Sequence, residues 1–532
     1  MNRTWQAAAL ATATALTAPV AATSQDLTMA VGAVVGSLDP HFYNVGPNNA
    51  MASMLFSRML ETDTQARVGP GLLESWRLLA DDTWEFKLRP GVRFHNGAGF
   101  TAEDIAFTVA RLPTIVNSPG SFTTYTRSIQ AVEVVDPLTI RIRTKGPYPA
   151  LLVDLARLPV VDRETHQNAT TDDFNAGRAA IGTGPFRLVE HRPGDRILLG
   201  RNEEYWGEKP AWRRVDYRMV TNDASRTAAL LAGDADFIDQ VPTSDVARLR
   251  HDQRVVISEV DSLRNMFIVY DHSRDGASPF ITDNEGRPLE RNPLRDLRVR
   301  RALSLAIDRQ AIVERVMEGV AAPTMQFVPP GVYGYVPDLQ PPRPDPEAAR
   351  RLLAEAGFPD GFRLTLHGSN DRYPNDGRTI QAVGQMWARV GVRTQVEAVP
   401  FSSFIGKASR QEYSVWLASW GSSTGETSAA MRSVLATYDR QRGLGAVNRG
   451  RYSNPEFDQR LLVAMREMDD ERRERQLQDA MRFVMADEPI TPLHMLKNVW
   501  AMRRGLTHAA RADELTRAQD VHPAATGTAP AR

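Results

Sequence analysis

The sequence contains no cysteine among its 532 residues. This absence excludes disulfide bonds, thiolate metal ligands, a cysteine nucleophile and lipid attachment through cysteine. Histidine is also scarce, with ten residues scattered along the chain and no paired spacing of the H-E-x-x-H type. We therefore expect neither a metal site nor any other cofactor.

The chain also lacks an excess of charge, because 64 basic residues face 64 acidic ones. A nucleic-acid partner is not expected, since such proteins show a basic face or domain. No phosphate-binding glycine motif occurs: the segment Gly182-Thr183-Gly184 is followed by Pro185, which has no N–H to donate, and so indicates a turn. Beyond the N-terminal stretch no run of about 18 apolar residues occurs, so no membrane-spanning helix is predicted.

The N-terminus has the pattern of a cleavable secretory signal. Arg3 precedes an uncharged stretch rich in Ala, Leu and Thr from Gln6 to Ala18, and small residues follow. We expect residues 1–22 to be a signal peptide with cleavage after Ala22, Ser24 being the next candidate, and the mature chain to be exported. An ordinary N-terminal helix is the alternative.

Alternating strand and helix signals predict an α/β protein with two lobes. In the first half, strands at 215–220 and 235–238 flank a helix that starts at Asp223, a β-α-β unit whose strands should be parallel. In the second half, residues 296–317 are predicted to be helical. Strands are predicted at 362–366, 392–399 and 413–420, and helices at 380–390, 401–409 and within 455–485. The segment from Thr507 lacks periodicity, so residues 507–532 are expected to be poorly ordered.

The segment Gly421–Gly425 matches the G-x-S-x-G motif of serine hydrolases. It follows a predicted strand, and Ser423 would be the nucleophile. Such an enzyme also needs a later histidine, for which His494 and His508 are available. Five-residue matches in Gly/Ser loops are common, so a turn or a ligand-contacting loop is favoured, and a periplasmic serine hydrolase remains the alternative.

Two side chains near the ends of predicted strands are candidates for ligand contact. Trp420 ends a strand just before a Gly/Ser loop, where clefts form in α/β lobes. Arg372 follows the strand at 362–366, and its planar guanidinium could hold a carboxylate through two hydrogen bonds. The alternative for Arg372 is a solvated arginine paired with Asp371 or Asp376, which spacing alone favours.

Several segments together resemble the solute-binding proteins of bacterial ABC importers, extracellular family 5, which includes dipeptide, oligopeptide, glutathione, opine and nickel binders. They occur in the family order between about residues 26 and 505. The segments are Ser37-Leu38-Asp39-Pro40-His41, Leu73-Glu74-Ser75-Trp76, the stretch from Trp84 to Gly97, Phe100 to Ile105, Gly182 to Phe186, Asn202 to Gly207, and Asp296 to Asp308.

The resemblance implies a two-lobed periplasmic-binding-protein clamp with a hinge and with mixed sheets flanked by helices. Lobe I would span mainly 23–268 and lobe II 269–490, with a return to lobe I at 491–506. Such a protein closes on its solute and delivers it to the membrane subunits of an ABC permease. The resemblance also implies a periplasmic monomer that catalyses nothing.

The resemblance gives Arg372 a role, because peptide-binding relatives place a carboxylate-binding arginine before a Tyr-Pro or Pro-Tyr pair, and Tyr373-Pro374 follows here. The aspartate that these relatives carry after the strand-end tryptophan is missing. Ser422 and Ser423 stand there instead and suit a neutral polar group. Trp420 and Tyr43 complete the expected ligand contacts. The expected solute is a peptide or a peptide-like, amino-acid-derived molecule, while aliphatic, sugar-like and metal-chelate ligands stay open.

Overall fold

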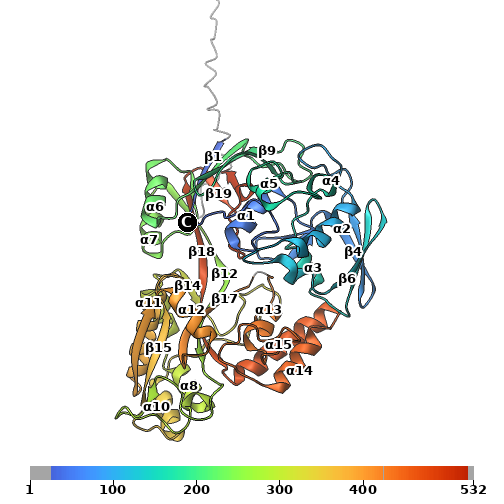
Figure 1. The fold of residues 1–532 in the computed structure, drawn as a ribbon. Coiled ribbons are helices and arrows are strands. Elements are labelled where there is room, and N and C mark those ends of the chain that lie inside the picture. The colour runs from blue at the N-terminus through green and yellow to red at the C-terminus, as the bar shows by residue number, and fades with distance from the viewer. Residues whose placement is uncertain (1–25, 423, 525–532) are drawn as a thin grey trace, which may run out of the picture.

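The computed structural model describes residues 26–422 and 424–524, and the predicted signal peptide and Ser423 lie outside these ranges. Two lobes are connected by long strands (Figure 1). The helices are α1 (Gly46–Leu55), α2 (Ala102–Arg111), α3 (Leu151–Leu155), α4 (Arg163–His166), α5 (Thr171–Asn175), α6 (Asp223–Ala232), α7 (Thr243–His251), α8 (Leu297–Leu305), α9 (Arg309–Arg315), α10 (Pro346–Glu355), α11 (Asp376–Ala388), α12 (Phe401–Ser409), α13 (Ser428–Ala430), α14 (Pro455–Ala464) and α15 (Asp470–Ala486). Single turns of other helix types are η1 (Leu112–Thr114), η2 (Phe122–Tyr125), η3 (Pro293–Arg295), η4 (Met431–Leu435) and η5 (Ala518–Asp520).

The strands are β1 (Asp26–Val31), β2 (Leu60–Thr62), β3 (Val68–Pro70), β4 (Leu73–Ala80), β5 (Thr83–Leu88), β6 (Ile129–Asp136), β7 (Thr139–Thr144), β8 (Phe186–Arg192), β9 (Arg196–Arg201), β10 (Arg214–Met219), β11 (Phe237–Ile238), β12 (Val255–Tyr270), β13 (Ile281–Thr282), β14 (Ala321–Pro323), β15 (Phe362–Ser369), β16 (Val392–Val399), β17 (Val415–Gly421), β18 (Ile490–Arg503), β19 (Leu506–His508) and β20 (Val521–Pro523). We call the part with β1 to β11, α1 to α7, β19 and β20 the first lobe. The part with β13 to β17 and α8 to α15 is the second lobe.

Strands β12 and β18 run antiparallel through both lobes and join them. They lie at the centre of a 12-stranded sheet with the order β13-β15-β17-β12-β18-β11-β1-β10-β9-β8, in which β14 also pairs with β18 and β16 with β15. Val260 of β12 packs on the first-lobe core, whereas Met266 belongs to a second-lobe core. The register shifts between these two positions, from Asp261 to Asn265. The predicted two-lobed α/β architecture is confirmed, and the lobes share one continuous sheet.

The predicted β-α-β unit forms, but its two strands are not neighbours in the sheet. Strands β10 and β11 have the same direction, with α6 between them in the chain. They are not adjacent, because β1 lies between them and pairs in parallel with both. The sequence pattern predicts direct pairing of β10 with β11, but β1 is inserted between them.

The predicted helical region 296–317 forms two helices. Asp296 begins α8 by accepting a hydrogen bond from the backbone N–H of Arg298. Asp308 begins α9 in the same way, from the N–H of Ala311. A side chain that caps a new helix interrupts the preceding one, which explains the break between Leu305 and Arg309.

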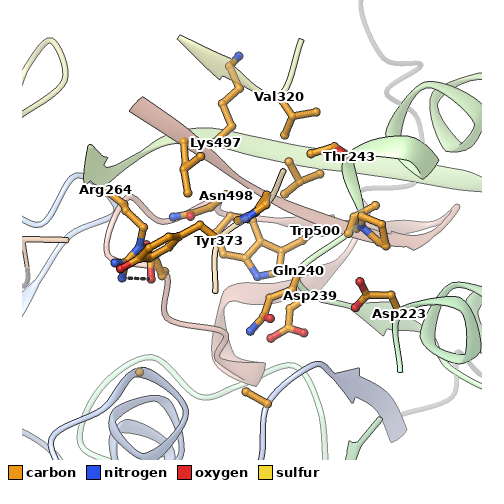
Figure 2. A pocket seen from close by; sticks show the side chains of 18 of the residues that line it. Asp223, Asp239, Gln240, Thr243, Arg264, Val320, Tyr373, Lys497, Asn498 and Trp500 are labelled. Atoms are coloured by element: carbon orange, nitrogen blue, oxygen red, sulfur yellow. Dashed lines mark hydrogen bonds and ion pairs between the residues drawn. The ribbon is translucent and has the colours of Figure 1, made fainter. Parts of the chain in front are cut away.

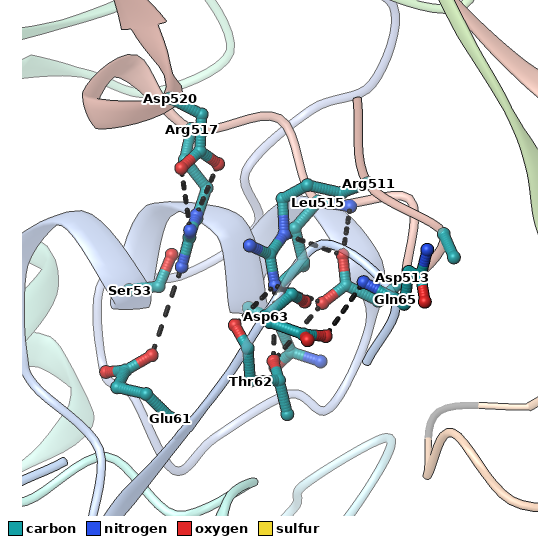
Figure 3. Close-up of polar contacts among 12 residues, drawn as sticks. Ser53, Glu61, Thr62, Asp63, Gln65, Arg511, Asp513, Leu515, Arg517 and Asp520 are labelled. Carbon is teal, nitrogen blue, oxygen red and sulfur yellow. Dashed lines mark hydrogen bonds and ion pairs between the residues drawn. The ribbon is translucent and has the colours of Figure 1, made fainter. Parts of the chain in front are cut away.

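The expectation that residues 507–532 are poorly ordered is wrong for residues 507–524. This stretch, which we call the C-terminal segment, forms β19, η5 and β20 and packs against the first lobe (Figure 3). The Arg511 guanidinium binds the Asp513 carboxylate at 2.7 Å and the backbone carbonyl of Thr62 at 3.1 Å, and both charged side chains are at most 2% exposed. Contacts with distant parts of the chain order this segment, so its lack of local periodicity misleads.

Candidate functional site

A cavity of about 790 Å³ lies between the two lobes beside β12 and β18 (Figure 2). The first lobe lines it with the ends of β1 and β11, the start of α1 and the start of α7. The second lobe contributes the loop 371–375 between β15 and α11. The floor comes from residues 496–500 of β18 and from Glu514 and Thr516 of the C-terminal segment. A solute in this cavity would therefore touch both lobes and the strands that connect them.

The loop that carries Arg372 is held by one buried carboxylate. Asp376 accepts hydrogen bonds from the hydroxyl of Ser369 at 2.7 Å and from the backbone N–H groups of Arg372 and Tyr373, each at 3.2 Å. Asn375 takes a left-handed conformation with φ of 55° and turns the chain into α11. The backbone of Arg372 is therefore fixed while its side chain extends from the loop.

The Arg372 guanidinium lies 5.2 Å from the ring of Tyr373 and 5.5 Å from that of Phe401. It makes no ion pair with any residue that the structure describes. The Asp371 carboxylate instead accepts the backbone N–H of Phe401 at 2.8 Å. Because Asp376 is engaged by the loop backbone, the interpretation of Arg372 as half of a local ion pair is wrong.

The other cationic side chains of the cavity lining are paired. Arg264 binds Glu514 at 3.1 Å, Arg378 lies 3.4 Å from Glu318, and the Lys497 ammonium lies 3.6 Å from Glu259. Arg372 is thus the one lining cation without a carboxylate within ion-pair distance in the described ranges. A guanidinium in this state is available to a ligand carboxylate.

Asp239, directly after β11, brings a carboxylate to the floor of the cavity (Figure 2). Its side chain is 8% exposed. Oδ1 accepts the backbone N–H of Gly32 at 2.7 Å, and Oδ2 accepts the hydroxyl of Thr516 at 3.2 Å. The Trp500 indole N–H in turn donates to the Thr516 oxygen at 2.9 Å. Burial raises the pKa of Asp239, and the Gly32 N–H opposes this effect.

The other predicted ligand contacts lie outside this cavity lining. Trp420 is half-buried on β17 against a second-lobe core, and its indole N–H is buried without a partner in the described chain. Ser422 is buried, and its backbone N–H donates to the Leu263 carbonyl at 2.9 Å. Tyr43 forms a β-bridge with Gly120. Ser423 is not among the described residues.

The two glycines of the hydrolase-like motif have packing roles. A Cβ atom at Gly421 would lie 2.7 Å from the Arg264 guanidinium. Gly425 has φ of 63°, and a Cβ there would collide with the carbonyl of Ala66 in the first lobe. The positive φ and the close approach to the Ala66 backbone therefore require glycine at position 425, whereas at position 421 the flexible Arg264 side chain could shift. The acid after the motif, Glu426, forms a buried ion pair with Arg473 at 2.8 Å.

Sequence reasoning missed Asp239, Glu514 and Thr516. Asp239 follows a two-residue strand in a stretch without a binding motif, so no local signal distinguishes it from a surface aspartate. Glu514 and Thr516 fall in the segment that the sequence predicts to be poorly ordered.

None of the helices in the described part of the chain is long and apolar enough to cross a membrane.

Two lobes that share a sheet and enclose a cavity between them define the class of two-lobed solute-binding proteins. The profile described as "Bacterial extracellular solute-binding proteins, family 5 Middle" matches residues 67–441. This chain therefore belongs to family 5 of the bacterial extracellular solute-binding proteins, the binding components of ABC importers. The match confirms the predicted family and function class, and it gives no support to a serine hydrolase.

Relatives match along nearly the whole chain. The glutathione-binding protein GsiB of Salmonella paratyphi A is 29% identical over 94% of both chains, and that of Escherichia coli K12 is 28% identical over the same shares. The structure of HbpA2 from Haemophilus parasuis matches 94% of this chain and 100% of its own, with a TM-score of 0.81 and 23% identity. The open form of the murein tripeptide binding protein MppA has a TM-score of 0.77 and 22% identity, covering 94% of this chain and 98% of its own.

Proposed function

We propose that this protein captures a peptide-like solute that carries a carboxylate, binds it in the cavity between the lobes and delivers it to an ABC permease. The observation that carries this proposal is the free guanidinium of Arg372 on a cavity wall whose other cations are paired. A carboxylate can accept two parallel hydrogen bonds from this planar group. The solute class also agrees with relatives that are named for binding glutathione and a murein tripeptide.

The proposal includes export and a passive role. The signal pattern at residues 1–22 and the extracellular location of the family support a periplasmic mature chain. The protein would act as a monomer that binds without chemical conversion. Binding at a site lined by both lobes favours the closed arrangement, because only that arrangement makes all contacts at once.

The test is calorimetric titration of the mature protein and of Arg372→Ala with reduced glutathione and with glutathione diethyl ester. Loss of a desolvated charge pair should cost about 2 kcal/mol or more, which is roughly a 30-fold loss of affinity for the free acid. The ester should bind weakly to both proteins. Arg372→Lys should retain part of the affinity, because lysine keeps the charge but not the planar fork.

The matched control is Arg363→Ala. Arg363 is an exposed arginine on β15, the strand that leads to the Arg372 loop, and it does not line the cavity. This variant should bind like the original protein. Unchanged binding by Arg372→Ala would remove this residue from the site.

Mass spectrometry of small molecules released from the purified protein should show a carboxylate-bearing compound. A released solute without an acidic group would contradict the proposed solute class.

A further inference from the structure

Asp239 is the most enclosed acidic side chain of the cavity lining, and its charge is poorly compensated. Arg226 supplies the nearest cationic nitrogen, Nε, which lies 4.0 Å from Oδ1 of Asp239. That N–H is donated to the backbone carbonyl of Asp239 itself at 3.0 Å. The two hydrogen bonds that the carboxylate does accept come from neutral groups. Asp239 therefore lacks the charge-assisted hydrogen bond that a buried carboxylate normally has.

Arg226 is committed elsewhere. Its Nη1 donates to the Val220 carbonyl at 2.9 Å, and its Nη2 donates to the Gln240 carbonyl and to the Asp223 carboxylate, both at 2.8 Å. Asp223 and Asp239 thus share one guanidinium, which pairs closely with Asp223. Together, Arg226, Asp223 and Asp239 have a net charge of −1. The negative charge that remains uncompensated is that of the buried Asp239.

The Asp239 carboxylate is held ready to accept further hydrogen bonds. Gly32 fixes one oxygen, and the chain from Trp500 through Thr516 fixes the other. A carboxylate has about four acceptor sites, so at least one on each oxygen remains for a donor in the cavity. An ammonium group supplies both the donors and the missing charge.

We infer that Asp239 binds the positively charged group of the solute, so that the cavity takes a zwitterion whose ammonium faces the first lobe and whose carboxylate faces Arg372 in the second. This inference rests on the proposed function. Asp239 would thus take over, from the other lobe, the role of binding the solute ammonium that relatives give to an aspartate after the strand-end tryptophan. A zwitterion that bridges the two walls would connect the lobes through its own two charges.

The test compares two matched probe pairs by calorimetric titration: reduced glutathione with its N-acetyl derivative, and Ala-Ala-Ala with N-acetyl-Ala-Ala-Ala. The proteins are the unmodified mature chain, Asp239→Asn and Asp234→Asn. The unmodified chain should prefer the free-amine form of at least one pair by about tenfold or more. Asp239→Asn should lose about tenfold for that form and change less than about twofold for the acetylated form.

Asp234→Asn is the matched control, because Asp234 is an exposed aspartate just before β11 that does not line the cavity. It should change the affinity for either form less than about threefold. Equal affinity of the unmodified chain for both forms overturns the inference, as does an Asp239→Asn variant that loses both forms alike or neither. If Arg372→Ala weakens binding while Asp239→Asn does not, this inference alone fails. If the unmodified chain binds none of the four probes, the proposed solute class fails with it.

Discussion

His494 lies on β18, and both of its ring nitrogens are buried without a hydrogen-bond partner in the described chain. Burial lowers the pKa of His494 to about 4. The unfolded chain has an ordinary histidine pKa near 6.5, so it takes up a proton that the folded chain refuses. The contribution of neutral His494 to the free energy of unfolding is thus fully present above pH 6.5 and is lost as the pH falls toward 4.

We expect His494→Leu to weaken the acid sensitivity of the protein. Leucine of similar size carries no titratable group, so up to about 3 kcal/mol of the stability difference between pH 7.5 and pH 4 should disappear. Urea unfolding at a series of pH values measures this. Gln253→Leu, at an exposed position without a titratable group, should leave the pH profile as it is. An unchanged profile in His494→Leu would contradict the assignment.

The C-terminal segment shows at the scale of elements how buried charge holds a chain end in place (Figure 3). Burial alone would raise the pKa of Asp513, but the charge of Arg511 and its hydrogen bonds lower it to about 2. The pair also reaches Thr62 and so connects the segment to β2. A second ion pair in the same segment joins Arg517 and Asp520 at 2.7 Å.

Asp513→Ala should destabilise the first lobe by about 3–5 kcal/mol, because it leaves Arg511 buried without a counter-charge. The double variant Arg511→Met with Asp513→Leu should cost less, since it removes both charges. Glu471→Ala is the exposed control: it removes a surface pair with Arg475 on α15 and should cost less than about 1 kcal/mol. Denaturant unfolding of all three compares them, and a double variant as unstable as Asp513→Ala would contradict this account.

Local sequence patterns predicted those elements that local interactions stabilise. The helix α12 spans the residues 401–409 that the sequence predicts, and Thr101 and Asp104, three residues apart, form a capping box at the start of α2. The insertion of β1 beside β10 and the order of the C-terminal segment depend on contacts between residues hundreds of positions apart. The same limit holds for the site: Arg372 has a recognisable loop, whereas Asp239 is placed by Gly32 and Thr516.

At the scale of the whole molecule, the lobes touch across the cavity as well as through β12 and β18. The Asn375 side-chain amide, at the start of α11, donates a hydrogen bond to the Thr243 hydroxyl of α7 at 2.9 Å. One partner belongs to each lobe. This contact therefore favours the present arrangement of the lobes over a more open one.

Thr243→Val, which removes the hydroxyl that accepts from Asn375 and leaves the loop backbone unchanged, should increase the population of open molecules when no solute is bound. One hydrogen bond contributes about 0.5–1.5 kcal/mol, so the ratio of open to closed should rise roughly two- to tenfold. Fluorescence energy transfer between dyes at Val189→Cys and Val463→Cys, exposed positions on the two lobes, measures the change, and the lack of native cysteine makes the labelling specific. Asn370→Ala, near the loop that carries Asn375, should have no effect, and an equal response of both variants would exclude a closing role for the contact between Asn375 and Thr243.

The position of the C-terminal segment determines when the first lobe can complete its folding during synthesis. A ribosome makes residues 511–517 hundreds of residues after Thr62 and Asp239, the first-lobe residues that they contact. The first lobe and the cavity floor therefore cannot finish folding before residues 511–517 have been made. This delay suits the proposed export of the chain across a membrane in an unfolded state, because the first lobe stays incomplete until residues 511–517 have been made.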